Sequence, residues 1–383
     1  MWRWLELSLL FLVFASVAGS VEGADKMRVY IGTYTGGESQ GIYASELDLK
    51  TGKLSPPELA AEVDNPTFLA IAPGGQQLYA AGEIGNFRGK KAGAVSAFEI
   101  NKADGKLTLL NQESSQGAGP CFVCVDHTGQ CVLVANYGGG SIASLPIEKG
   151  GKLAPAASSI QHEGSSIDKS RQAAPHAHSI NVDPTNKYAL AADLGLDKIL
   201  IYDLDPKAAT LKPHDPAFAA TVPGGGPRHL AFHPDGKFAF VCNEMLSSVT
   251  SFAYDAKQGQ LTLLETLSTL PQDYNKPGNS TAEVLVHPNG KFVYVSNRGH
   301  NSIAIFAFDA ATGKLQALGH QSTNGKTPRN FGIDPTGQYL LACNQDSHTV
   351  QVFRIDPATG ELVATGDSIT VPMPVCVKFL AHE

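Results

Sequence analysis

The sequence predicts an all-β protein, a seven-bladed β-propeller with four antiparallel strands in each blade and a ring closed between the chain ends. Three observations support this prediction. A strand–turn–strand unit recurs along the chain, the recurrences are about 50 residues apart, and each end of the chain holds only part of a unit.

The recurring unit is clearest around the turn Pro-Asp-Gly at residues 234–236. An apolar run at 230–232 precedes the turn, and apolar residues alternate over 238–242 after it. Proline presets φ and glycine permits a positive φ, so the turn reverses the chain into a hairpin. The hairpin brings the start of its first strand beside the end of its second, which places Arg228 near Glu244.

Equivalent turns lie at residues 75, 129, 186, 236, 290 and 337, with separations of 54, 57, 50, 54 and 47. The first unit lacks a first strand: residues 27–35 and 41–49 read as second and third strands, and 51–54 begin a fourth. Residues 372–380 read as a first strand with nothing after it. Joining these ends gives seven complete blades and pairs strand edges that would otherwise be exposed.

Residues 1–24 resemble a secretory signal, because Arg3 precedes an apolar stretch over 7–19 and small residues follow. An uncleaved membrane anchor is the alternative, although the apolar run is short for a span of ~20 residues. We therefore expect a signal peptide at 1–24, a propeller domain at 25–383, and a protein exported to the periplasm or secreted.

The formal net charge is −7, and the chain has no basic run. This balance argues against a nucleic-acid partner or an anionic membrane, and we expect a monomer. The six cysteines fall in strand-like segments, so we expect buried free thiols. The lone Cys-x-x-Cys at 121–124 would point its two thiols to opposite faces of a sheet, which argues against a metal site there. We expect no metal and no cofactor.

Polar residues concentrate at one mouth of the predicted channel, where first strands begin and second strands end. The residues expected there are His176, His178, Arg228, His229, Glu283 and Arg329 from first strands, and Glu83, Asn136, Tyr137, Asp193, Glu244, Arg298, Asn344 and Gln345 from second strands. Arginine binds carboxylate or phosphate, glutamate or histidine can activate water, and nearby cations can stabilise an oxyanion. Lactone or ester hydrolysis requires these groups and no redox cofactor.

Some of these residues also have purely structural interpretations. His229, His233 and His287 lie near turns or within hairpins, where a structural role is the more common one. No Gly-x-Ser-x-Gly nucleophile elbow is expected, because the one match, Gly-Glu-Ser-Gln-Gly at 37–41, falls between two expected strands and not between a strand and a helix, so a serine nucleophile is not supported. The polar segment at 161–175 is too long for a plain turn, and we expect it to cover one mouth of the channel.

Several stretches resemble the lactonase family of seven-bladed propellers, typified by propeller-type 6-phosphogluconolactonases. They include residues 31–35, 41–43, 161–166, 171–172, 175–178, 226–229, 243–244, 296–300, 327–331 and 344–346. A muconate-lactonizing cycloisomerase shares this fold. The histidine, two arginines and glutamate proposed for its site would fall on His178 (or His176), Arg228, Arg298 and Glu244.

The resemblance implies hydrolysis of a sugar lactone, phosphorylated or not, to the open-chain acid. We expect Glu244, His178, Arg228 and Arg298 to be catalytic. The expected substrate contacts are His176, Arg329, Asn344, Asn136 and Glu283. Two alternatives remain open at this point: a muconate-type lactonizing cycloisomerase and a secreted ligand-binding propeller without catalysis.

Overall fold

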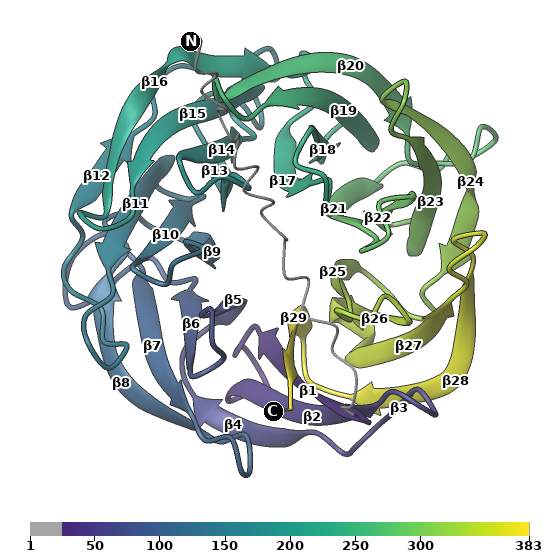
Figure 1. Ribbon diagram of the computed structural model, residues 1–383, viewed down its shortest axis with the longest axis horizontal. Coiled ribbons are helices and arrows are strands. Elements are labelled where there is room, and N and C mark those ends of the chain that lie inside the picture. The colour runs from purple at the N-terminus through teal and green to yellow at the C-terminus, as the bar shows by residue number, and fades with distance from the viewer. Residues whose placement is uncertain (1–24, 383) are drawn as a thin grey trace, which may run out of the picture.

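The computed structural model describes residues 25–382, which form seven β-sheets arranged as blades around a central axis (Figure 1). The expected signal segment at 1–24 lies outside the described residues. The innermost strands contact one another in the cyclic order β5, β9, β13, β17, β21, β25, β29 and back to β5, so the ring is closed. This arrangement confirms the predicted seven-bladed propeller.

Six blades are continuous in sequence and each has four antiparallel strands. From the inside outward they are β5 (Pro66–Ile71), β6 (Gln77–Gly82), β7 (Ala94–Ile100) and β8 (Leu107–Ser114); β9 (Pro120–Val125), β10 (Cys131–Asn136), β11 (Ser141–Pro146) and β12 (Ser158–Gln161); β13 (Ala177–Val182), β14 (Tyr188–Asp193), β15 (Lys198–Asp205) and β16 (Thr210–Ala220); β17 (Pro227–Phe232), β18 (Phe238–Asn243), β19 (Ser248–Asp255) and β20 (Gln260–Ser268); β21 (Ser280–Val286), β22 (Phe292–Arg298), β23 (Ser302–Asp309) and β24 (Lys314–Ser322); and β25 (Pro328–Ile333), β26 (Tyr339–Asn344), β27 (Thr349–Ile355) and β28 (Leu362–Thr370).

The seventh blade joins the two ends of the chain, as predicted. It consists of β29 (Pro374–Ala381), β1 (Lys26–Thr33), β2 (Gly41–Asp48), β3 (Lys53–Leu54) and β4 (Glu58–Glu62). Strand β29 is innermost and pairs antiparallel with β1, with Val377 opposite Ile31 and Phe379 opposite Val29. The outer strand of this blade is split into β3 and β4, because Pro56 and Pro57 separate the two pieces and cannot donate to the ladder.

The blades pack face to face, so their central strands are buried on both sides. All six residues of β10 and of β26 are buried. A tyrosine of the second strand repeatedly reaches the outer turn of the adjoining blade: the hydroxyl of Tyr79 donates to the carbonyl of Gly151 at 3.0 Å, and that of Tyr294 to Gly360 at 2.9 Å. The six cysteines are all unpaired, which confirms the expectation of free thiols.

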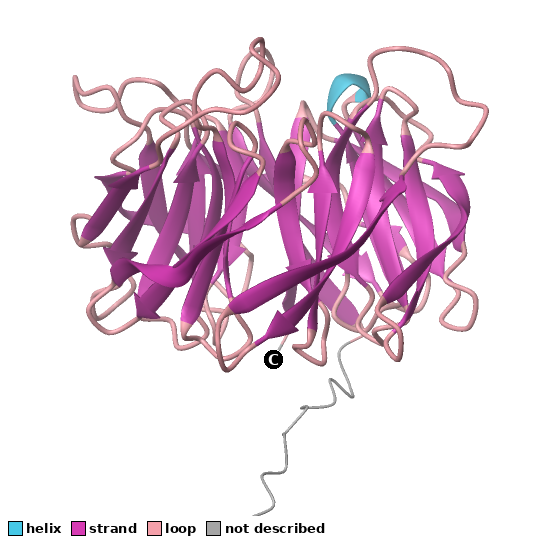
Figure 2. Cartoon of the chain, turned by 90° about the horizontal axis from the view of Figure 1, so that it is seen from above, coloured by secondary structure: helices cyan, strands magenta, loops and turns pink. Residues whose placement is uncertain are grey.

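The starts of the innermost strands and the ends of the second strands open on the upper face in Figure 2, where the short 3-10 turn η1 (Gln345–Ser347) follows β26. The C-terminal end of the chain lies toward the opposite face. Two histidines expected to be structural join neighbouring blades at turns: Nε2 of His233 lies 2.8 Å from the carbonyl oxygen of Gly290, and Nε2 of His287 lies 2.9 Å from that of Gly337.

Candidate active site

A register shift near the start of every innermost strand determines which side chains reach the channel. In β17 the pairing passes from Pro227 opposite Asn243 to His229 opposite Cys242 and skips Arg228. Such a bulge re-aims the skipped side chain, and bulges are common beside active sites. The same shift skips Thr67 in β5, Cys121 in β9, His178 in β13, Arg329 in β25 and Val375 in β29. In β21 a wider irregularity leaves out Ala282 and Glu283, together with Ser296 of the partner strand.

Six of the skipped residues line one small cavity on the channel axis. The cavity contains about 10 Å³ of space, roughly the room that one water molecule needs. Its walls are formed by Thr67, Phe68, Glu83, Cys121, His178, Arg228, His229, Arg329 and Val375. Six of the seven blades therefore contribute to a single polar chamber.

Glu244, the residue after β18, binds three arginines beside this chamber. Its Oε2 accepts from Nε of Arg228 at 3.1 Å and lies 2.9 Å from Nη2 of Arg298, while its Oε1 accepts from Nη2 of Arg171 at 2.7 Å. The side chains of Glu244, Arg228 and Arg298 are almost fully buried. Nε of Arg298 is also buried and has no hydrogen-bond partner among residues 25–382, so this donor is left for a bound ligand or water.

The cluster is strongly charged at neutral pH. Burial opposes ionisation of Glu244, but Arg298, Arg228 and Arg171 outweigh it and lower the pKa of this carboxyl to about 2. Burial and the neighbouring Arg228 lower the pKa of Arg298 to about 10, which leaves its guanidinium protonated. Glu244 is therefore an ionised acceptor that orients a donor well but is a weak base.

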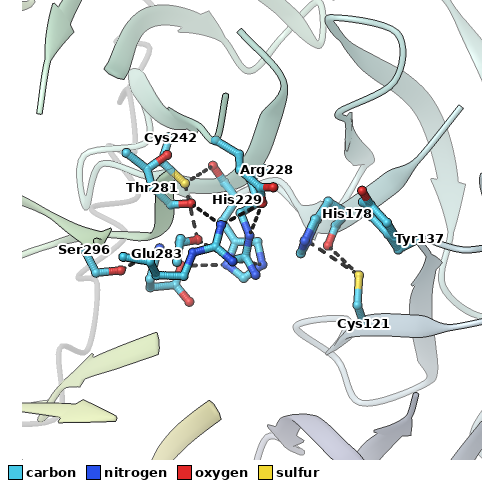
Figure 3. Close-up of polar contacts among 12 residues, drawn as sticks. Cys121, Tyr137, His178, Arg228, His229, Cys242, Thr281, Glu283 and Ser296 are labelled. Atoms are coloured by element: carbon cyan, nitrogen blue, oxygen red, sulfur yellow. Dashed lines mark hydrogen bonds and ion pairs between the residues drawn. The ribbon is translucent and has the colours of Figure 1, made fainter. Parts of the chain in front are cut away.

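His229 links Arg228 to a second buried carboxylate, Glu283 (Figure 3). Nη1 of Arg228 lies 3.2 Å from Nε2 of His229, and Nδ1 of His229 lies 2.9 Å from Oε1 of Glu283. A guanidinium can only donate, so Nε2 accepts and the imidazole proton resides on Nδ1. Asn330 binds the other carboxylate oxygen of Glu283.

His229 is neutral in this environment. Burial, opposed by Glu283 and reinforced by Arg228, lowers the pKa of its imidazole to about 4. Unlike His233 and His287, this histidine lines the cavity. The sequence placed His229 at the correct mouth but could not distinguish it from the two structural histidines, because its partner Glu283 lies 54 positions away.

His178 lies on the other side of the cavity, with Sγ of Cys121 3.5 Å from its Nδ1 (Figure 3). Its ring meets that of His229 edge to face at 5.2 Å between centroids and lies at the same distance from the ring of Tyr137. Burial and the nearby Arg228 hold the pKa of His178 well below its usual value, so the imidazole is neutral. Burial raises the pKa of the Cys121 thiol, which therefore stays protonated.

Arg329 enters the cavity from β25 without a carboxylate partner of its own. No ion pair to Arg329 forms within residues 25–382, and its guanidinium carbon lies 5.5 Å from the ring centroid of Tyr34. The hydroxyl of Tyr34 contacts both carboxylate oxygens of Glu83, at 3.1 and 3.0 Å. Arg329 is thus a cation available to an incoming oxygen anion.

The remaining predicted contacts lie outside the Glu244 cluster. His176 stacks on Tyr137 with 4.6 Å between centroids, and its Nδ1 lies 3.0 Å from the Tyr137 carbonyl oxygen. The side-chain amide of Asn136 donates to the carbonyl of Ser115, and that of Asn344 donates to the carbonyl of Thr323. Each amide therefore anchors the segment that leads into its own blade.

Arg171 is the main site residue that sequence reasoning did not select. It lies in the loop between β12 and β13, which was expected to cover this mouth, and it donates to Glu244 and, at 3.2 Å, to the hydroxyl of Tyr137. A loop has no periodicity from which a contact 73 positions away could be inferred. The available signal was the Arg-Gln pair within a stretch already noted for its family resemblance.

Comparison with known proteins shows the family of this chain. The family model described as "Lactonase, 7-bladed beta-propeller" matches residues 28–379. The chain is 38% identical to a 6-phosphogluconolactonase of Bacillus subtilis over 351 residues, which cover 92% of this chain and 97% of that protein. It is 34% identical to a 6-phosphogluconolactonase of Formosa agariphila over 315 residues, covering 80% and 86% of the two chains.

A solved structure shows the same relationship in three dimensions. The periplasmic gluconolactonase of Pseudomonas aeruginosa superposes with a TM-score of 0.88 at 33% identity, covering 94% of this chain and all of that one. The match of the family model over nearly the whole described chain, together with these relatives, establishes the relationship. This chain belongs to the lactonase family of seven-bladed β-propellers.

Proposed function

We propose that this protein hydrolyses a sugar lactone to the corresponding open-chain acid. The observation that carries the proposal is the convergence of Arg228, Arg298 and Arg171 on Glu244, beside a chamber lined by His178 and Arg329. Relatives named 6-phosphogluconolactonase and gluconolactonase support this assignment. They do not favour a lactonizing cycloisomerase or a non-catalytic binding propeller.

The site contains the groups that lactone hydrolysis needs. Water attacks the ring carbonyl carbon, a C–O bond forms, and the carbonyl oxygen becomes an oxyanion that Arg228, Arg298 or Arg329 can stabilise. Collapse of this intermediate breaks the ring C–O bond, and the alkoxide that leaves takes up a proton. The reaction consumes one water and yields a hydroxy acid.

We assign the positioning of this water to Glu244 and His178. Glu244 is ionised and His178 is neutral at neutral pH, so each can accept a hydrogen bond or a proton from water. The low pKa of Glu244 favours an orienting role for the carboxylate. Asn136, Asn344, His176 and Glu283 remain proposed substrate contacts.

An assay of the purified mature protein tests the assignment. We expect gluconolactone, 6-phosphogluconolactone or both to open faster than in matched buffer, measured by acid release at constant pH. Rates equal to buffer hydrolysis on both lactones would refute the substrate assignment. Depletion of muconate without lactone opening would instead indicate a cycloisomerase.

We also propose export, from the character of residues 1–24. A relative of known structure is described as periplasmic, which supports this location. Within residues 25–382 no helix is long and apolar enough to cross a membrane. Cell fractionation and mass spectrometry of the mature N-terminus test the proposal, and an intact N-terminus in the cytoplasmic fraction would contradict it.

A further inference from the structure

The three arginines around Glu244 differ in exposure. The side chain of Arg171 is 44% exposed, whereas those of Arg228 and Arg298 are 3% and 13% exposed. Arg171 is also the only one of the three that comes from a loop and not from a blade strand or its end. It is therefore the cation of this cluster that an arriving substrate meets first.

The two oxygens of Glu244 are divided between these arginines. Arg228 and Arg298 both bind Oε2, and Arg171 binds Oε1. If the Arg171 side chain moves away, Oε2 keeps both of its buried partners and the carboxylate stays in place. Oε1 then becomes available as an acceptor for water.

The backbone that carries Arg171 is firmly anchored, so movement is confined to its side chain. Asp197 accepts from the hydroxyl of Ser166 at 2.6 Å and from the amide of Gln172 at 2.7 Å, which fixes the loop on both sides of Arg171. The same carboxylate accepts from the backbone N–H groups of Gly224 and Gly226, at 2.7 and 2.8 Å, just before Arg228. One buried aspartate thus sets the position of the loop relative to β17.

We propose that Arg171 is a displaceable cap on Glu244: an anionic substituent of the substrate, remote from the lactone carbonyl, draws the guanidinium away and uncovers Oε1 for the attacking water. This inference rests on the proposed lactonase function and identifies the substrate class as lactones that carry a phosphate or carboxylate group. A guanidinium binds such a group through two parallel hydrogen bonds, which would replace the contacts that Arg171 gives up to Glu244 and to the Tyr137 hydroxyl.

The experiment compares Arg171→Ala and Arg171→Lys with the wild type on gluconolactone and 6-phosphogluconolactone. Lys169→Ala is the matched control, because Lys169 lies in the same loop and its amine donates to the Ser166 carbonyl at 2.8 Å. We expect Arg171→Ala to lower the ratio of kcat/KM for the phosphorylated over the unphosphorylated lactone by on the order of tenfold or more. Arg171→Lys should keep only part of the ratio, because an ammonium retains the charge but cannot form two parallel hydrogen bonds. Lys169→Ala should leave the ratio unchanged.

The pH profile provides a readout that a purely structural role would not change. Arg171 is one of the cations that lower the pKa of Glu244, so its removal should raise that pKa and move the acid limb of kcat/KM to higher pH. An equal loss of kcat/KM on both lactones, together with an unchanged acid limb, would refute the proposal that Arg171 is a displaceable cap.

Binding of the two products separates this inference from the proposed function. Calorimetry with 6-phosphogluconate and gluconate should show a preference for the phosphorylated acid that Arg171→Ala removes. If the wild type opens neither lactone, the hydrolase assignment fails, yet this preference still reports on Arg171 as an anion site. Equal binding of the two acids by wild type and variant would refute the inference even in an active lactonase.

Discussion

The backbone N–H of Val377 donates to the side-chain oxygen of Asn330 at 2.9 Å, and this bond joins the closing strand of the propeller to the polar site. The amide of Asn330 binds Glu283, Glu283 binds His229, and His229 accepts from Arg228. Ring closure and the orientation of Arg228 are therefore parts of one hydrogen-bonded chain.

We expect Asn330→Ala to lower both stability and activity. The substitution leaves the Val377 N–H and one Glu283 oxygen without partners in a buried region, which costs about 1–3 kcal/mol for each group. Denaturant unfolding measures the stability, and kcat at a temperature well below the transition measures the activity. A variant as stable as the wild type would show that water replaces the lost amide.

Glu244→Gln should reduce kcat by a factor on the order of 10²–10⁴. Glutamine keeps the shape but removes the charge that compensates three guanidiniums and orients water. Glu361→Gln, at an exposed outer position, is the matched control. Circular dichroism establishes that the variant is folded, and a rate within threefold of the wild type would exclude Glu244 from the chemistry.

Acid should destabilise the fold through its buried neutral histidines. An unfolded histidine titrates near 6.5, whereas the pKa of His229 is lowered to about 4 in the fold and that of His178 is also strongly lowered. As the pH falls from about 6.5 to about 4, the unfolded chain takes up protons that the folded chain does not, so stability decreases. The contribution of Glu244 is lost mostly below this window, as the pH falls from about 4.5, where its carboxyl titrates in the unfolded chain, to about 2, its pKa in the fold.

Thermal unfolding across this pH range tests the sign and the source of the effect. His229→Gln should lose less stability than the wild type between pH 6.5 and 4, by on the order of a few kcal/mol. His127→Gln, at an exposed turn of the opposite mouth, should follow the wild type. Parallel curves for the wild type and His229→Gln would contradict the prediction.

The sequence was sufficient for the architecture because turn residues and apolar alternation repeat in every blade. The hairpin argument alone brought Arg228 to Glu244, and the structure shows this pair in contact at 3.1 Å. The same argument, applied to the neighbouring blades, predicted that Arg298 and His178 lie at the same mouth. Whether these residues act as proposed is a question for the assays above.

The finer geometry was not accessible from pattern alone. A bulge shifts the strand pairing by one residue, so that Arg228, and not His229, has no partner in the hydrogen-bonded ladder. The bulge leaves the apolar pattern of the sequence almost unchanged. One local signal did exist, because a proline precedes the skipped residue at Thr67, Cys121, Arg228, Arg329 and Val375. Arg171 had no such signal, since tertiary contacts through Asp197 place its loop.

Truncation after Val371 should abolish folding or cause aggregation. The deleted segment contains β29, which pairs with β1 along its length and lies between β25 and β5 in the inner ring. Val375 and Val377 are 3% and 2% exposed, and burial of a large apolar side chain is worth ~1.5–3 kcal/mol. These two side chains alone would supply a sizeable part of a typical net stability of about 5–15 kcal/mol.

The deletion also exposes strand edges and breaks the bond from Val377 to Asn330. Exposed edges pair with other chains, so light scattering and size-exclusion chromatography should detect aggregates where the full mature chain is uniform. Removal of residue 383 alone is the control, because it leaves β29 intact. A chain truncated after Val371 that stays monomeric and melts within a few degrees of the full mature protein would show that the closing strand does not hold the ring together.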